Sequence, residues 1–424
     1  MQVLYPRCAG LDIGSRSLVC CVRIVEAGQV TTVVQTFGMT SKALVNLQEW
    51  LTEQKCTHVA MEATGVYWRP VWHMLEGHFE LVLANAHHIK NVPGRKTDVN
   101  DATWIAQLLA HGLIRSSFVP PPEVTEMRDL TRTRKQLVQE QTRHVQRIHK
   151  VLEDTNMKPG AVFTDVMGKS GRAVLGSLVA MTPGPTDPHM LQKLVNYRVK
   201  ASFEEQLEAL TGRVTRAQQV LLQVHLSQYD TLETALATLD AEIMERLRPF
   251  EQSYELLQTI PALGSKLASV VAAEIGFDMT RFPTAGHLLS WAGLCPGQNE
   301  SAGKRKATPT RKGDHWLKLA LVQAAWVAVR MKVTYFRAQY LRLKTRMPPK
   351  KAIVAVAASM LKAAYFILLR KVPYQELGAD YFERREPSAK LARLVRQLKN
   401  LGLTVTIDTE RKSAVVASPQ PVAS

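Results

Sequence analysis

The chain has 424 residues, which is too long for a single small module and predicts two or three domains. Apolar residues make up 46% of it and charged residues 21%, a balance that excludes wholesale disorder. The 54 Lys and Arg residues outnumber the 37 Asp and Glu residues, so the formal net charge is +17. Such an excess favours nucleic acid as the partner, because Lys and Arg displace counterions from phosphates.

The cysteines and the apolar runs bear on the compartment. Five cysteines without a CxxC pair or a Cys/His cluster indicate neither a disulfide framework nor a zinc module, and they favour a reducing compartment. The N-terminus shows no secretory signal. The most apolar run, 352–369, has Lys362 in its middle, so we expect a buried helix and no membrane contact.

Residues 1–118 predict an α/β domain. They hold ten basic and nine acidic residues, so nearly all of the net charge lies downstream. Strand patterns alternate with helix patterns along this part of the chain. Three antiparallel strands are expected at 8–14, 17–25 and 30–37, two further strands at 58–62 and 80–84, and helices at 41–53, 70–76 and 98–111.

The rest of the chain predicts mainly helices. Three consecutive prolines at 120–122 mark a boundary. Apolar periodicity then predicts one long helix from Met127 to Leu152 and a second over 203–247, with a break at 182–188. The two helices fit an antiparallel hairpin, a coiled-coil dimer arm or a simple bundle. We assign 119–248 to this linker and helical region, 249–386 to a mainly helical domain, and 387–424 to a helix and flexible tail that is disordered from Ser413.

Four acidic residues of the first domain are candidate metal ligands. The strand pattern buries Asp12 in an apolar strand, Glu62 ends another strand, and Asp98 and Asp101 lie three apart at a helix start. Converging carboxylates repel each other unless divalent cations lie between them, and oxygen ligands suit Mg²⁺ or Mn²⁺. Such ions can activate a nucleophile at a phosphate. The alternative is structural, with Asp98 as a helix N-cap and Asp101 three residues into the helix.

Two segments downstream could contact DNA. Ile260 to Gly264 forms a turn between two helices that is similar to a helix-hairpin-helix motif, although Ala262 stands where such turns usually have glycine, and an ordinary helical hairpin remains open. Ser301 lies in a polar loop directly before three basic residues, which could stabilise an alkoxide and hold the phosphate that it attacks. A serine in a loop more often has no catalytic role.

Basic residues that could bind nucleic acid concentrate in the second half of the chain. Residues 330–351 contain eight Lys and Arg residues and no acid, with Tyr335, Phe336 and Tyr340 among them, a pattern that suits a phosphate backbone with stackable bases. The candidates for nucleic-acid binding are Arg95, Lys96, Lys304, Arg305, Lys306, Arg311, Lys312, Arg337, Arg342, Lys344 and Arg346.

Taken together, these motifs resemble the IS110 insertion-sequence family of transposases, which is related to Piv-type DNA invertases. The resemblance covers most of the chain and rests on Gly10 to Gly14, Met61 to Gly65, Lys96 to Ala102, Ile260 to Gly264, Ala273 to Gly276, Arg281 and Phe282, Trp291 to Pro296, and Ser301 to Gly303. It implies an RNase H-like, RuvC-like DEDD domain in which Asp12, Glu62, Asp98 and Asp101 bind metal. It also implies that Ser301 is the nucleophile that becomes linked to DNA.

The same resemblance implies the wider function. The chain would recombine donor and target DNA without terminal inverted repeats, and a structured noncoding RNA from the element would choose the sites. It would act as a homodimer that assembles to a tetramer in the bacterial cytoplasm, associated with the nucleoid. The carboxylates of one subunit could meet Ser301 of another in a composite site.

Three alternatives stay open. A RuvC-like junction endonuclease would use water in place of the serine. The strand that carries Asp12 and Gly14 also opens actin-like ATPases and sugar kinases, but the sequence shows no second glycine-rich phosphate loop and that reading does not explain the basic C-terminal half. A non-catalytic remnant of a mobile element would keep the binding surfaces alone.

Overall fold

The computed structural model describes residues 2–63, 65–85, 89, 100–117, 119–297, 300–301, 303–305, 310, 313–385, 387–401, 403–408 and 413–417. Only the backbone is described at 300–301, 304–305, 387–390, 393, 404–408 and 413–417. The chain folds as two compact units, Met1–Pro120 and Pro121–Ser424, so the division falls within the three prolines. The division into four parts drawn from the sequence stays a prediction.

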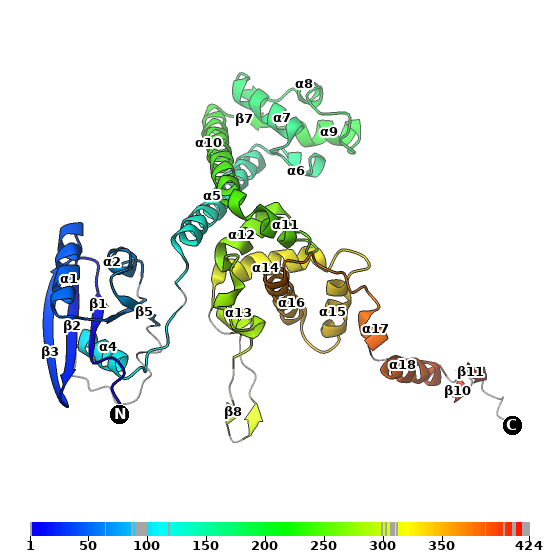
Figure 1. Cartoon of the computed structure of the whole chain (residues 1–424). Helices are drawn as coiled ribbons and strands as arrows, with labels where there is room; N and C mark the ends of the chain where they lie inside the picture. The colour runs from blue at the N-terminus through cyan, green and yellow to red at the C-terminus, as the bar shows by residue number, and fades with distance from the viewer. Residues whose placement is uncertain are drawn as a thin grey trace. The chain divides into compact units, whose positions relative to one another are not determined.

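The N-terminal unit is built on a five-stranded sheet of order β3-β2-β1-β4-β5 (Figure 1). The first three strands form an antiparallel meander, and β4 and β5 run parallel to β1. The predicted α/β class and every predicted strand are confirmed. The strands are β1 (Arg7–Ile13), β2 (Ser17–Glu26), β3 (Gln29–Gly38), β4 (His58–Glu62) and β5 (Glu80–Ala84).

Helices cover both faces of this sheet, since alternate strand residues point to opposite sides. Leu11 of β1 and Met61 of β4 pack with α1 (Ser41–Glu53) and α2 (Trp68–Leu75) in one core cluster. Cys8 and Ala60, on the other face of the same strands, pack against α4 (Asp101–Ala110). Helix α4 begins at Asp101, three residues later than predicted.

In the C-terminal unit, α5 (Pro122–Asp154) and α10 (Arg216–Leu247) lie side by side and are called the helical arm (Figure 1). Their contacts pair early residues of one with late residues of the other: Arg246 donates to Glu126, Arg134 to Asp240, and a ring nitrogen of His144 lies 3.3 Å from one of His225. The helical arm is therefore an antiparallel hairpin within one chain, one of the three predicted arrangements.

A small helical subdomain joins the two long helices. It consists of α6 (Pro159–Val162), α7 (Lys169–Ala180), α8 (Pro188–Gln192), α9 (Phe203–Leu210) and the paired short strands β6 (Gly184–Pro185) and β7 (Arg213–Val214). The single helix predicted over 203–247 is wrong, because α9 ends at Leu210 and α10 starts anew. Thr215 and Gln218 form a reciprocal capping box at that start, which satisfies backbone amides that a continuous helix would have paired.

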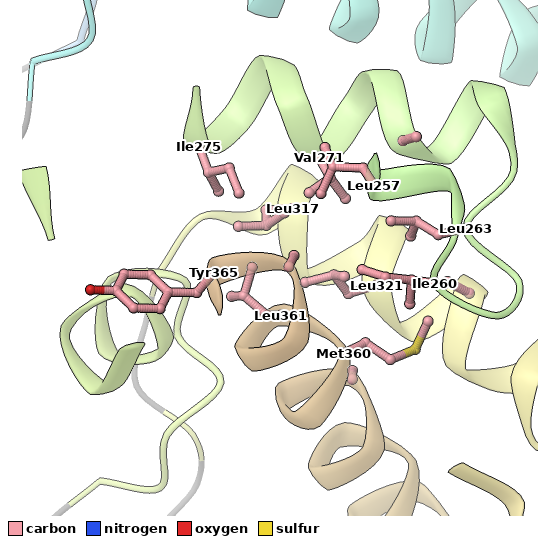
Figure 2. Packing of buried hydrophobic residues seen from close by; sticks show 14 of the residues in the cluster. Leu257, Ile260, Leu263, Val271, Ile275, Leu317, Leu321, Met360, Leu361 and Tyr365 are labelled. Carbon is pink, nitrogen blue, oxygen red and sulfur yellow. The ribbon is translucent and has the colours of Figure 1, made fainter. Parts of the chain in front are cut away.

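One hydrophobic core of the C-terminal unit is built around α16 (Pro349–Arg370), and Figure 2 shows Met360, Leu361 and Tyr365 of this helix within it. By length and composition α16 could cross a bilayer, but most of its apolar stretch is buried in the protein, so the prediction of a buried helix is confirmed. The other elements are η1 (Arg248–Phe250), α11 (Glu251–Gln258), α12 (Ser265–Ile275), η2 (Met279–Arg281), α13 (Ala285–Trp291), α14 (His315–Ala328) and α15 (Tyr335–Lys344).

The C-terminal end continues with α17 (Tyr381–Arg385), α18 (Pro387–Asn400), β10 (Thr404–Asp408) and β11 (Ser413–Ala417). The last two strands pair antiparallel over their whole length. The predicted disorder from Ser413 is therefore wrong for Ser413–Ala417, where cross-strand hydrogen bonds order the backbone. Residues 418–424 lie outside the described part of the chain.

Candidate catalytic and nucleic-acid-binding sites

The position of α4 is set by a glycine in β1. A Cβ placed on Gly10 would lie 2.3 Å from the carbonyl oxygen of Ala102 and 2.3 Å from the backbone nitrogen of Ala106. The backbone of α4 thus rests directly on β1, which no residue larger than glycine allows. The sequence analysis did not single out this role of Gly10. The signal for it is a glycine inside an apolar strand, together with two alanines four residues apart on a helix.

Three of the four predicted acids come together at this contact. Asp12 lies two residues beyond Gly10 on the same face of β1. Glu62 ends β4, whose register pairs Leu11 with Met61, so Asp12 and Glu62 are the next residues along neighbouring parallel strands. Asp101 opens α4, one residue before the contact of Ala102 with Gly10.

The pKa of Asp12 is consistent with this approach of the three acids. Partial burial raises the pKa of the Asp12 carboxyl, and the negative charges of Asp101 and Glu62 raise it further. The residue as a whole stays exposed, so the expectation that the strand buries Asp12 is wrong: it lies near the end of β1. The carboxylates are therefore close enough to repel each other.

The predicted helix cap is corrected by the structure. The N-cap of α4 is Asn100, whose side-chain oxygen accepts a hydrogen bond of 3.0 Å from the backbone of Ala102. Asp101 is therefore the first residue of α4 and does not lie three residues into a helix capped by Asp98. Asp98 itself falls outside the described residues, as do Arg95 and Lys96.

The acids fit a divalent cation in chemistry and charge. Asp12, Glu62 and Asp101 offer only carboxylate oxygens, the ligand type that Mg²⁺ and Mn²⁺ prefer. Within the described residues, no three His, Cys, Asp or Glu side chains already form a cluster that could hold a metal ion. Asp98, the candidate for a fourth ligand, lies outside the described residues.

Ser301 lies on a short β-hairpin between α13 and α14. Strand β8 (Glu300–Ser301) pairs antiparallel with β9 (Lys304–Arg305), which places Ser301 directly across from Lys304. The turn between them uses Gly303 at a φ of 74°, a left-handed conformation that favours glycine. Lys306, Arg311 and Lys312, three further candidates for DNA contact, lie outside the described residues.

The two ends of this loop are held together. Pro296 and Thr310 form a β-bridge, and Gly313 lies so close to Gly293 that a Cβ would be 2.2 Å from its nitrogen. The Lys318 ammonium donates to the Gly293 carbonyl at 3.3 Å and to the Thr310 hydroxyl at 2.6 Å. Lys318, one of the basic residues that follow Ser301, therefore serves here to fasten the base of the loop.

The basic segment 330–351 is only partly available to nucleic acid. Arg342 is half-buried with its guanidinium 4.9 Å from the Phe382 ring centre, and Arg337 donates to the Arg330 carbonyl at 3.5 Å. Lys344 and Arg346 are exposed. The structure places these four predicted residues on and just after α15, and the last two are the better candidates for phosphate contact.

The three aromatic residues of this segment do not form a stacking surface. Phe336 is buried, Tyr335 packs on Tyr381 and Phe382, and Tyr340 meets Trp326 edge to face. The prediction that they stack on bases is wrong for Phe336. The rings build the contact of α15 with its neighbours instead.

The turn at Ile260 to Gly264 does join two helices, α11 and α12. Ile260 and Leu263 are buried in the core, and Ala262 adopts a φ of 67°, the left-handed conformation of the glycine that it replaces. Gly264 is the N-cap residue of α12. Phosphate binding by the backbone amides of this turn stays a prediction.

Two family profiles match the chain. The DEDD transposase profile of IS110 elements, described as transposase, matches residues 9–157. The profile described as the transposase IS116/IS110/IS902 family matches residues 254–341. The chain belongs to the IS110 family of transposases. In this family member the first match holds the four acids and α5, and the second holds Ser301 and the first part of α15.

Two curated relatives of this IS110-family chain are proteins of insertion elements. An uncharacterized 44.8 kDa protein of IS116 from Streptomyces clavuligerus is 27% identical over 53% of this chain and 62% of its own length. An uncharacterized 43.6 kDa protein of IS110 from Streptomyces coelicolor is 27% identical over 70% of this chain and 74% of its own length. The chain thus spans about three fifths of the first relative and three quarters of the second.

Proposed function

We propose that this protein is a transposase that cuts and rejoins DNA with Ser301 as nucleophile and a divalent cation at the acidic residues. The observation that carries the proposal is the convergence of Asp12, Glu62 and Asp101 on the α4 face of the sheet, where the neighbouring charges raise the pKa of Asp12. The family supports DNA as the substrate.

The reaction would be a phosphoryl transfer. The Ser301 hydroxyl loses its proton to solvent as its oxygen attacks a DNA phosphorus. The bond from phosphorus to one bridging ribose oxygen breaks, and that oxygen takes up a proton from solvent and leaves as a hydroxyl. A bound Mg²⁺ or Mn²⁺ would supply charge stabilisation at the phosphate. Asp12, Glu62, Asp101 and Asp98 would hold it, and Lys304 and Arg305 beside Ser301 would position the phosphate.

The finer features of the proposal follow the family resemblance. The N-terminal unit would be an RNase H-like, RuvC-like domain, and the sheet with helices on both faces supports this. The proposal also includes a structured guide RNA that selects the DNA sites. The protein would act as a dimer that assembles to a tetramer, with a catalytic site shared between subunits. The net charge of +17 and the run of basic residues without acids in 330–351 support a nucleic-acid partner and are compatible with RNA as well as DNA.

The decisive experiment detects the covalent intermediate. The protein is incubated with the DNA and RNA of its own element and Mg²⁺, and denaturing electrophoresis then separates any protein that is attached to a DNA strand. We expect an adduct that disappears in Ser301→Ala, in Asp12→Asn and after chelation of the metal. Ser227→Ala, at an exposed serine of α10, is the matched control and should keep the adduct.

The junction endonuclease is the second candidate, because the acids meet within the N-terminal unit without any contribution from Ser301. It predicts that Ser301→Ala still cuts DNA in a metal-dependent way, with water as nucleophile. An adduct that persists in Ser301→Ala would show that another residue is the nucleophile.

A further inference from the structure

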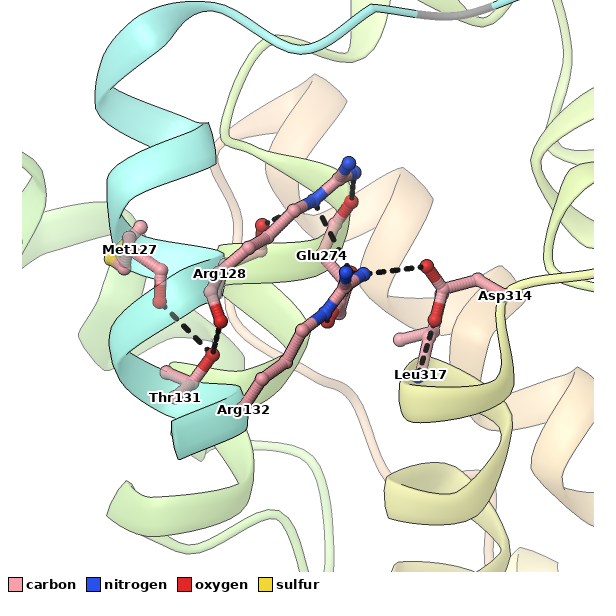
Figure 3. Close-up of polar contacts among 8 residues, drawn as sticks. Met127, Arg128, Thr131, Arg132, Glu274, Asp314 and Leu317 are labelled. Atoms are coloured by element: carbon pink, nitrogen blue, oxygen red, sulfur yellow. Dashed lines mark hydrogen bonds and ion pairs between the residues drawn. The ribbon is translucent and has the colours of Figure 1, made fainter. Parts of the chain in front are cut away.

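Two arginines of α5 share one buried carboxylate (Figure 3). Arg128 and Arg132 lie four residues apart, so both side chains extend from the same face of the helix. Arg132 binds Glu274 of α12 with two hydrogen bonds of 2.9 and 2.7 Å, and Arg128 lies 3.2 Å from the same carboxylate. The Glu274 side chain is 0% exposed, so the two guanidinium groups replace its water.

The same two arginines contact both ends of the loop that carries Ser301. Arg128 lies 5.6 Å over the ring of Trp291, the last residue of α13, where the loop begins. Arg132 lies 5.7 Å over the ring of Trp316, in the first turn of α14, where the loop has ended. A guanidinium stacks well on a tryptophan face, and its planar shape fixes the orientation of the contact.

Arg132 makes a further contact with the loop end through Asp314. Its Nη2 donates to Asp314 Oδ2 at 3.3 Å, while Asp314 Oδ1 accepts from the backbone of Leu317 at 2.8 Å and so caps α14 (Figure 3). The backbone nitrogen of Asp314 in turn donates to the carbonyl of Trp291 at 3.4 Å. One side chain of α5 is thereby connected to the residues on both sides of the loop.

We propose that Arg132, assisted by Arg128, is a positioning residue that holds the Ser301 loop in the orientation needed for attack on DNA. The inference rests on the proposed role of Ser301. Helix α5 is also the first element after the proline linker from the acid-bearing unit. This set of contacts, called the clamp (Arg128, Arg132, Glu274 and Asp314), fastens both ends of the serine loop to α5. A small displacement of a nucleophile costs a large part of its rate.

A purely structural role is the competing explanation, and Arg134 provides the matched control. Arg134 lies on the same helix, is similarly buried, and pairs with Asp240 of α10 through both carboxylate oxygens, away from the serine loop. Arg132→Gln and Arg134→Gln each remove one positive charge from α5. The first breaks the ion pairs with Glu274 and Asp314, and the second breaks the pair with Asp240. Only Arg132→Gln loosens the loop ends.

The experiment measures single-turnover formation of the Ser301–DNA adduct by the full chain with its DNA, RNA and Mg²⁺. Nucleic-acid affinity is measured separately on the same samples. We expect Arg132→Gln to slow the adduct step by roughly 100-fold, with affinity changed less than about threefold, whereas Arg134→Gln keeps the wild-type rate. Equal rates in the two variants would overturn the proposal.

Asp314→Asn serves in case Arg132→Gln does not fold. Asparagine still caps α14, but its side chain loses the charge that faces Arg132, so we expect a slower adduct step, by roughly fivefold, in a folded protein. An unchanged rate in a folded Asp314→Asn protein would count against the clamp.

Amide hydrogen exchange tests the clamp independently of the proposed reaction. Exchange at residues 293–297 and 313–317 should be faster in Arg132→Gln than in Arg134→Gln, whether or not any DNA is cut. If wild-type protein forms no adduct, the proposed function fails while this comparison still tests the clamp. Unchanged exchange at both loop ends would refute the clamp alone.

Discussion

A single carboxylate, Glu274, illustrates how much one buried side chain can determine. It is the residue before the last of α12, in a helix that is mostly alanine and valine around it, and its two arginine partners come from α5, more than 140 residues earlier in the chain. Burial raises the pKa of Glu274 to about 7, although the hydrogen bonds and charges of Arg132 and Arg128 oppose this. The residue therefore titrates near neutrality, where an ordinary glutamate does not.

This shift predicts a pH-dependent stability. Because the pKa is higher in the folded protein than the model-peptide value of 4.5, the folded state binds the proton more tightly. The stability that this proton contributes is complete below pH 4.5 and is lost as the pH rises through 7. The free energy of unfolding of the wild type, relative to that of Glu274→Gln, should fall by about 3 kcal/mol over this range.

Urea unfolding of both proteins at several pH values measures this difference directly. The other titrating groups are common to both proteins and cancel in the comparison. Curves that run parallel from pH 4.5 to 7 would show that Glu274 keeps an ordinary pKa.

The contact between α4 and β1 shows how an element is placed by a single small residue. Side-chain periodicity predicts that a helix covers this face of the sheet, but it does not say how closely the helix approaches. Gly10 lets the α4 backbone touch the strand, and that approach brings Asp101 next to Asp12. The acidic site therefore depends on packing at a position that has no polar side chain.

Substitution of Gly10 tests this dependence. Gly10→Ala should lower the free energy of unfolding of the N-terminal unit by about 3 kcal/mol, because the added methyl meets backbone atoms of α4 that cannot move independently. It should also reduce adduct formation, since Asp101 is displaced. Gly38→Ala is the control, because a Cβ there would lie at an ordinary 3.5 Å from Ala43. Similar thermal unfolding of the two variants would contradict this account.

Over the whole molecule, charge is distributed unevenly between a nearly neutral N-terminal part and a basic remainder. The structure also separates the basic candidates that already contact other groups of the protein from those that are exposed. Arg342 is engaged with Phe382 and Arg337 with a backbone carbonyl, whereas Lys344 and Arg346 are exposed. Counterion release makes only the cations that reach phosphates contribute to the salt dependence of binding.

The salt dependence of nucleic-acid binding should separate these residues. The double variant Lys344→Gln, Arg346→Gln should reduce the slope of log affinity against log salt by about 2, and weaken binding similarly for all sequences. The matched control is Lys42→Gln with Lys55→Gln, at two exposed lysines of the N-terminal unit. A slope that the first pair leaves unchanged would exclude Lys344 and Arg346 from the phosphate contacts.

Some differences from the prediction concern signals that the sequence does contain. The break between α9 and α10 coincides with Gly212 and with the pair Thr215 and Gln218, a recognisable capping box inside an otherwise continuous apolar periodicity. The start of α4 could not be chosen in this way. Asp98 and Asn100 are both good N-cap residues, so only the packed position of the helix decides between them.

The sequence by itself determined much of the local structure: each strand of the N-terminal sheet, the long helix α5, the buried helix α16 and the family likeness follow from periodicity and short motifs. The tertiary structure decided how Asp12 approaches Glu62 and Asp101, and it alone paired Arg132 with Glu274 and Asp314. Periodicity assigns a residue to a face but not to a partner. Which residues become partners depends on how closely two elements pack. A single glycine or buried charge can change that distance without altering the apolar periodicity of either element.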